Sequence, residues 1–473
     1  MRGKRDRTAV GPAGGEVSFT VARMTANERK AEFFMTETIQ NKNTENKMTE
    51  GSRAVLVGAV TQGTTTDEVE AELEELSGLL DTAGGTAVAR VIQNLQTPDP
   101  RTLIGSGKVK EIAGLCKNEE ADLVVFDVEL SPSQIRNLEE EIGGDVRVID
   151  RSMLILDIFA LHATTGEGKM QVELAQLQYT APRLTGNGMD LSRLGGGIGT
   201  RGPGESKLET DRRHMKRRME ALRAELDDLE RTRKTMRSSR DKSGVPKVAI
   251  VGYTNAGKST LLNRLTGAGI LAEDKLFATL DPTTRKYTLP GGERILLSDT
   301  VGFIRKLPHH LIKAFRSTLD EAVYADILLI LVDASDPEYR AHLKVTEELL
   351  SDLGAGEKPT LFVFNKCDRT TEPPECPFPK TEGVEVAYIS AATGEGVDEM
   401  IAKLTTLLHE GKKKIVFRIP NADAGALNTL YRNATVETVE YTEDGMLVTA
   451  TVDEKTRGML RRFDSTYPEP EQF

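Results

Sequence analysis

The octapeptide Gly252–Ser259 (GYTNAGKS) constrains the fold most, because it matches the pattern G-x-x-x-x-G-K-[ST] in the context that this pattern requires. The apolar segment Lys247–Val251 before it predicts a strand, and Leu261–Leu265 after it predicts a helix. Glycines let backbone N–H groups face phosphate oxygens, and the N-terminus of the helix adds a favourable dipole. The segment therefore predicts a polyphosphate-binding loop in an α/β domain.

The polar side chains of this loop have separate predicted roles. We expect Lys258 to reach the β- and γ-phosphates and to act in catalysis, and the Ser259 hydroxyl to bind Mg²⁺. The other nucleotide-binding positions predicted here are Gly252, Asn255, Ala256, Gly257 and Thr260. This loop alone does not distinguish GTP from ATP.

The segment Asn365–Asp368 (NKCD), after the apolar strand predicted at Leu361–Phe364, indicates which base is bound. The Asp368 carboxylate can accept two hydrogen bonds from the N1–H and 2-amino groups of guanine, whereas adenine offers no such donor pair at that edge. Leaving that carboxylate unpaired would penalise the wrong base. We expect Asn365 to contact the base and brace the phosphate loop, and the aliphatic stem of Lys366 to cover the ring.

The segment Asp299–Gly302 (DTVG) follows a strand predicted at Ile295–Ser298. An aspartate at position 299 can hold Mg²⁺ through water, and the Gly302 amide can meet the γ-phosphate. We therefore place both residues in the nucleotide site and assign Gly302 to catalysis as well. Such a segment senses which nucleotide is bound.

The segment Phe277–Pro282 (FATLDP) lies between the phosphate loop and Asp299. We predict that Thr279 supplies a second hydroxyl to Mg²⁺ and takes part in catalysis. The alternatives for this role are Thr283 and Thr284.

A fifth segment, Ile389–Ala391, follows the strand predicted at Val384–Tyr388. It adds Ser390 and Ala391 to the nucleotide site, with the Ala391 amide positioned to meet guanine O6. Together the five segments resemble the five guanine-nucleotide motifs of translation-factor-class GTPases. Mg²⁺ is therefore the predicted cofactor.

One part of the hydrolytic machinery differs from related GTPases. Many small GTPases place a glutamine directly after D-x-x-G, but this chain has Phe303, which cannot hydrogen-bond the attacking water. We expect slow intrinsic hydrolysis that a partner stimulates. A subset of related GTPases uses an asparagine at the position of Asn255 to ligate K⁺ between the phosphates. We hypothesise a K⁺ site here; the alternative is that Asn255 only shapes the loop.

The remaining sequence predicts further domains around the G domain at 244–412. Residues 1–50 are polar and are expected to form a disordered tail. Strands alternate with helices over 51–165, which predicts an N-terminal α/β domain. Three strands with a turn at Asp444-Gly445 predict a small α+β domain at 413–473.

Residues 166–243 predict a helical hairpin with a glycine-rich tip, Leu191–Glu205. Steps of three and four residues between apolar side chains favour a paired seam over the alternative, two unpaired surface helices. Gly197–Gly202 also spells G-x-G-x-x-G, but no strand precedes it and Pro203-Gly204 follows, so a dinucleotide site is rejected. The second helix carries basic residues suited to RNA phosphates: Arg212, Arg213, Lys216, Arg217 and Arg218. Acidic residues are interleaved with them, so a merely solvated face is the alternative.

The domain order, the hairpin, the segment Gly195–Glu205 (GGGIGTRGPGE) and the segment Phe277–Arg285 (FATLDPTTR) resemble the HflX family of ribosome-binding GTPases. The resemblance implies binding to the large ribosomal subunit and its rRNA, GTPase stimulation by the ribosome, and ribosome splitting or rescue under stress. Two other functions are weighed: a GTP-dependent ribosome assembly or RNA-modification factor, and a regulatory GTP-binding module with negligible hydrolysis.

Composition sets limits on these functions. The net charge of −11 excludes a uniformly basic nucleic-acid-binding surface, so any RNA contact must come from a local patch. The three cysteines lack metal-ligand spacing and cannot form a disulfide framework. The sequence contains no run of about 18 apolar residues, so we predict no membrane span. We expect a cytoplasmic protein that acts as a monomer.

Overall fold

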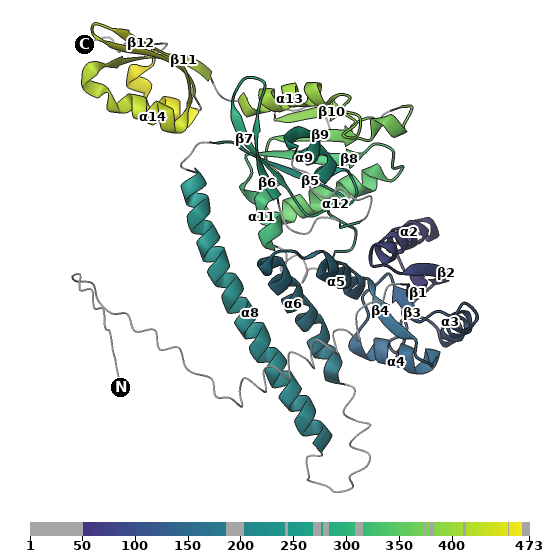
Figure 1. Cartoon of the computed structure of the whole chain (residues 1–473). Helices are drawn as coiled ribbons and strands as arrows, with labels where there is room; N and C mark the ends of the chain where they lie inside the picture. The colour runs from purple at the N-terminus through teal and green to yellow at the C-terminus, as the bar shows by residue number, and fades with distance from the viewer. Residues whose placement is uncertain are drawn as a thin grey trace, which may run out of the picture. The chain divides into compact units, whose positions relative to one another are not determined.

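The structure is a computed structural model that describes residues 51–185, 203–241, 245–267, 276–277, 283–307, 316–372, 374–377, 383–409, 413–452 and 454–465 (Figure 1). All of them belong to the second of two units into which the chain divides, Thr49–Phe473. The predicted tail at 1–50, most of the hairpin tip and Thr279 lie outside the described residues.

The first described domain is a four-stranded parallel sheet in the order β2-β1-β3-β4. The strands are β1 (Arg53–Val60), β2 (Thr86–Asn94), β3 (Leu123–Phe126) and β4 (Arg147–Asp150). The helices that alternate with them are α2 (Thr66–Thr82), α3 (Ser106–Asn118) and α4 (Pro132–Ile142). Six consecutive residues of β1 are buried, as expected for a parallel strand covered on both faces. The predicted α/β class of this domain is confirmed.

Helix α5 (Arg151–His162) follows β4 directly, and the sequence analysis assigned no element there. The Asp150 carboxylate caps this helix by accepting a hydrogen bond from the Met153 amide (3.0 Å). Residues 151–159 are all buried, so the helix lacks the polar face that would reveal a helical period in the sequence.

The middle region contains α6 (Gly166–Thr180), the 3₁₀ turn η1 (Ala181–Thr185) and the long helix α8 (Pro203–Asp241). Leu174 and Leu177 of α6 pack against Leu222 of α8. Glu173 pairs with Arg218 and Glu167 pairs with Arg233, so the residue numbers run in opposite directions along the two helices. The helices therefore form the antiparallel pair that the sequence predicted.

The G domain has a six-stranded sheet in the order β10-β9-β8-β5-β7-β6, in which only β6 runs antiparallel to its neighbour. The strands are β5 (Lys247–Gly252), β6 (Thr283–Thr288), β7 (Arg294–Asp299), β8 (Ile327–Asp333), β9 (Thr360–Asn365) and β10 (Val384–Tyr388). The helices are α9 (Lys258–Thr266), α11 (Arg316–Tyr324), α12 (Tyr339–Asp352) and α13 (Val397–His409), with a 3₁₀ turn, η2, at Cys367–Arg369. Four of the five predicted motifs follow the carboxyl ends of β5, β7, β9 and β10, which is where open α/β sheets bind ligands.

The C-terminal domain is an antiparallel sheet in the order β11-β13-β12. Its elements are β11 (Lys413–Pro420), η3 (Asn421–Asp423), α14 (Gly425–Asn433), β12 (Thr435–Thr442), β13 (Gly445–Val452), α15 (Glu454–Met459) and η4 (Arg461–Phe463). The hairpin turn lies at residues 443–444, one position before the predicted Asp444-Gly445, because Gly445 already pairs with Thr442 in the ladder. The α+β class is as predicted.

Across the described ranges, none of the helices is both long and apolar enough to cross a bilayer.

Candidate functional site

The loop between β5 and α9 has a backbone conformation that requires particular residues. Gly257 has φ 95°, and a Cβ built there would lie 2.3 Å from the Nδ2 atom of Asn365. Only glycine allows that approach. Asn255 also has a left-handed φ of 59°, which asparagine tolerates better than most residues.

Lys258 begins α9 and is buried inside the loop. Its ammonium donates hydrogen bonds to the carbonyl oxygens of Gly252 (3.2 Å) and Tyr253 (2.8 Å). Burial lowers the pKa of Lys258 to about 8, although the nearby Asp299 carboxylate acts against the shift. Phosphate oxygens would be stronger, charge-assisted partners than two neutral carbonyls. The side chain is therefore suited to receive a polyphosphate.

Ser259 and Asp299 come together from the two sides of the loop. The Ser259 hydroxyl donates to Oδ2 of Asp299 (2.7 Å), and Asp299 is fully buried. Burial raises the pKa of Asp299, and its Oδ1 has no hydrogen-bond partner among the described residues. A buried carboxylate oxygen without a partner, beside a hydroxyl, suits a hard divalent cation. The two residues thus fit the predicted Mg²⁺.

The segment after Asp299 runs along the phosphate loop as an additional backbone ladder. The Phe303 amide donates to the Gly252 carbonyl (3.1 Å), and the Thr254 amide donates to the Phe303 carbonyl (2.8 Å). A Cβ on Gly302 would lie 2.8 Å from Cα of Thr254, so this position requires glycine. The Phe303 ring is 1% exposed and thus belongs to the core.

On the base side, Asn365 joins two of the predicted motifs. Its Nδ2 donates to the Ala256 carbonyl (2.8 Å), and its Oδ1 accepts from the Ala391 amide (2.8 Å). Asp368 is exposed, and a hydrogen bond from Ser390 holds the pKa of its carboxyl below the usual range. The carboxylate is therefore an ionised acceptor at the place where a guanine edge is predicted to bind.

Two residues that the sequence analysis did not single out also hold this side together. The Lys366 ammonium pairs with Oδ2 of Asp333 (2.7 Å), the last residue of β8. Nε of Arg264 donates to the Ala391 carbonyl (2.6 Å). Asp333 could have been found from its position, because it directly follows an apolar run that predicts a strand. Arg264 gives no such signal.

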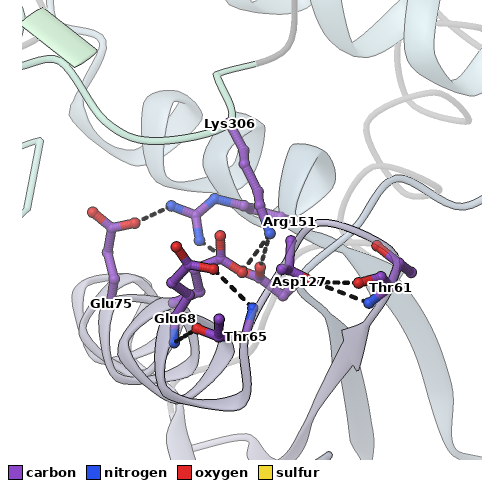
Figure 2. Close-up of polar contacts among 9 residues, drawn as sticks. Thr61, Thr65, Glu68, Glu75, Asp127, Arg151 and Lys306 are labelled. Carbon is purple, nitrogen blue, oxygen red and sulfur yellow. Dashed lines mark hydrogen bonds and ion pairs between the residues drawn. The ribbon is translucent and has the colours of Figure 1, made fainter. Parts of the chain in front are cut away.

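Charged residues of the first domain form a cluster with Lys306 of the G domain (Figure 2). The Arg151 guanidinium of α5 binds Oδ1 of Asp127 (2.7 Å) and the carboxylate of Glu75 on α2. Nζ of Lys306, just after the D-x-x-G segment, reaches Oδ2 of Asp127 (2.8 Å) and Oε2 of Glu72 (2.5 Å). Each buried charge therefore has an opposite charge beside it.

Tyr253, in the phosphate loop itself, completes this cluster. Its hydroxyl donates to Glu75 and accepts a hydrogen bond from the Arg305 amide (2.8 Å). Its ring stacks on His342 with the centroids 3.8 Å apart. Burial raises the pKa of Tyr253, so the phenol stays protonated. The sequence analysis did not anticipate this contact.

The described residues thus bring together most of the predicted site, from Gly252 through Thr260, Asp299 and Gly302 to Asn365, Lys366, Asp368, Ser390 and Ala391. Thr279 lies outside them. Of its alternatives, Thr283 pairs with Asp299 in the β6–β7 register, and the Thr284 hydroxyl shares a hydrogen bond with Ser298 (2.9 Å).

Models of three protein families match consecutive parts of the chain. The N-terminal region of a GTP-binding GTPase matches residues 70–160, and its middle region matches 162–240. A model described as a 50S ribosome-binding GTPase matches residues 247–366.

Curated relatives extend the similarity over nearly the whole chain. The GTPase HflX of Lacrimispora saccharolytica is 51% identical over 88% of this chain and 96% of its own. The proteins of that name from Caldanaerobacter subterraneus and Escherichia coli are 46% and 41% identical, over 87% and 84% of this chain and 93% and 92% of their own. On these matches, the chain belongs to the HflX family of GTPases.

Proposed function

We propose that this GTPase binds guanine nucleotide across the carboxyl ends of β5, β7, β9 and β10, with the residues predicted above. The observation that carries the proposal is the pair of hydrogen bonds made by the Asn365 side chain, which connect the Ala256 carbonyl of the phosphate loop to the Ala391 amide. That side chain makes the phosphate edge and the base edge parts of one site. Asp368 then selects guanine through its paired acceptors.

The hydrolytic roles follow from charge and position. Lys258 would exchange its two carbonyl partners for β- and γ-phosphate oxygens. Mg²⁺, held by Ser259, Thr279 and (through water) Asp299, would neutralise charge on the phosphates. The Gly302 amide would bind the γ-phosphate, and the ladder at Phe303 fixes where that amide stands. Because Phe303 is buried, orientation of the attacking water is assigned to another group.

Asn255 is the proposed ligand of a K⁺ ion, which would lie between the phosphates and add positive charge there. The support is its position within the phosphate loop and its left-handed φ of 59°. The test compares single-turnover GTP hydrolysis in K⁺ and Na⁺ at equal ionic strength, for the wild type and Asn255→Ala. Faster hydrolysis in K⁺ by the wild type only is the expected result, and equal rates in both salts would remove the K⁺ role.

The proposed partner is the large ribosomal subunit, including rRNA, with splitting or rescue of ribosomes under stress as the outcome. The support is the family description of residues 247–366 and the pairing of α6 with α8, because the arginines of α8 offer phosphate contacts. Sedimentation of intact ribosomes in sucrose gradients, with protein and GTP, tests it. Free subunits are expected; unchanged intact ribosomes together with bound protein would favour an assembly factor instead.

A further inference from the structure

The contact between β8 and the Asn365–Asp368 segment carries a further inference. We infer that Asp333 is a positioning residue for guanine binding, which holds the Lys366 ammonium so that the aliphatic stem of Lys366 lies against the base. This inference rests on the proposed guanine-nucleotide site. It adds one residue, outside the five predicted motifs, to the determinants of affinity.

The two strand ends that carry these residues are fixed to each other. Asp333 and Asn365 are register partners in the parallel β8–β9 pair. The Ala334 amide donates to the Asn365 carbonyl (2.8 Å), which continues the ladder past the last strand residue. The distance between the Asp333 carboxylate and the backbone of Lys366 is therefore set by the sheet.

The Asp333 carboxylate is itself held in one orientation. Its Oδ1 accepts hydrogen bonds from the Ser335 amide (3.0 Å) and the Ser335 hydroxyl (2.6 Å). Its Oδ2 is then directed to the Lys366 ammonium (2.7 Å). The Asp333 side chain is 21% exposed and the Lys366 side chain is 14% exposed, so water competes less for this ion pair than for one on the open surface.

Lys366 is fixed at its other end too. Its backbone has φ 64°, a left-handed conformation that is costly for a lysine and persists where neighbours impose it. Asn365 on one side is held by Ala256 and Ala391, and on the other side the Cys367 amide donates to the Ile389 carbonyl (3.1 Å). With both backbone and ammonium fixed, the methylene stem is an ordered apolar surface before any base arrives.

Pre-ordering of this kind raises affinity because the rotamer entropy of a long side chain is lost before binding. Asp333 also neutralises a second ammonium near the phosphate loop, since the Lys366 charge contributes to lowering the Lys258 pKa. A lysine stem contacts the face of a base and not its edge. Asp333 should therefore contribute to affinity for guanine and hypoxanthine alike, whereas Asp368 should distinguish them.

The test measures fluorescent GDP binding by the full chain. Asp333→Asn keeps the size of the side chain and removes its charge, and it should weaken GDP binding by about tenfold, or about 1.4 kcal/mol. Asp333→Glu should recover most of that loss. Glu348→Gln is the matched control, because it removes the charge of an exposed carboxylate that pairs with Lys344 on the surface of α12, and it should change affinity by less than about twofold.

A double-mutant cycle with Lys366→Met separates positioning from a general structural role. If Asp333 acts through the lysine, the double variant should bind GDP no more weakly than Lys366→Met alone. The ratio of GDP to inosine diphosphate affinity should stay unchanged in Asp333→Asn and change in Asp368→Asn. Additive losses, or an altered ratio in Asp333→Asn, would overturn the inference.

Nucleotide binding by the wild type distinguishes failure of the Asp333 role from failure of the proposed guanine site. Wild-type protein that prefers GDP to ADP, combined with an Asp333→Asn variant of unchanged affinity, would overturn the role of Asp333 alone. Wild-type protein that binds ADP as tightly as GDP would overturn the guanine site, and the role of Asp333 with it.

Discussion

The two sides of the proposed nucleotide site are built from different parts of the chain. On the base side, Asn365, Lys366 and Asp333 are held by strands and loops of the G domain alone. On the phosphate side, Tyr253 and Lys306 are bonded to Glu75, Glu72 and Asp127 of the first domain.

Under the proposed function, this difference separates recognition of the base from sensing of the γ-phosphate. The hydrogen bonds and ion pairs given above for Asn365, Lys366 and Asp333 all lie within the G domain, so the geometry of the base side should survive changes elsewhere. On the phosphate side, Gly302 is three residues from Arg305, whose amide is fixed by Tyr253. A shift of that backbone on GTP binding would have to break or carry along the contacts with Glu75 and Asp127. The predictions below test this separation.

The largest effect is expected for Arg151→Met. It leaves the Asp127 and Glu75 carboxylates without their shared cation, which should lower the free energy of unfolding by about 3–5 kcal/mol. Urea unfolding measures it. The control is Arg90→Met, whose partner Glu74 lies on the surface and whose loss should be at most about 1 kcal/mol. Equal losses in the two variants would mean that the buried cluster does not stabilise the contact.

Lys258→Met should slow single-turnover GTP hydrolysis by about 10²–10³-fold, because it removes a charge aimed at the transferring phosphate. Preference for GDP over ADP should remain, since Asp368 and Asn365 are untouched. Loss of base preference in this variant would show that the two sides are not separable.

A smaller effect is expected for Glu75→Gln. The amide keeps the size of the side chain but removes the charge that faces Arg151 and Tyr253, at a cost of about 1–3 kcal/mol of stability. GDP affinity should change by less than about twofold, because the hydrogen bonds of Glu75 go to Arg151 and Tyr253 and not to the residues that bind the base. A tenfold weaker affinity for GDP would contradict the separation of the base side from the phosphate side.

The smallest effect is a dependence on pH. The pKa of Lys258 is about 8 in the free protein, and phosphate binding should raise it by favouring the ammonium. Affinity for GTP should be constant below pH 8 and should fall above it, by at most about tenfold per pH unit, since binding then requires proton uptake. Calorimetry at pH 8.5 in buffers of different ionisation enthalpy measures that uptake, which Lys258→Met should abolish.

The candidate site could be predicted from the sequence because its motifs are contiguous and four of the five follow an apolar strand. Gly257 and Asn365 were predicted from local patterns, and the structure places them in contact. The sheet classes followed from the alternation of strands and helices. Helix α5 was missed because a helix buried on all sides has no amphipathic period.

The charged cluster was missed for a different reason. Tyr253 and Glu75 are 178 positions apart, and Arg151 and Asp127 belong to a domain without a motif of its own. Nothing in the local sequence around a glutamate indicates which distant phenol or guanidinium it will meet. Such pairs depend on how the domains pack, and a single sequence carries no record of that.

The most direct test of the central claim is the base preference of the purified protein. We predict that the wild type binds GDP about 10⁴-fold more tightly than ADP, and that Asp368→Asn loses GDP affinity while gaining affinity for xanthosine diphosphate, whose 2-oxo group accepts the new amide N–H. Equal binding of ADP and GDP, or an Asp368→Asn variant that still binds GDP like the wild type, would contradict the account.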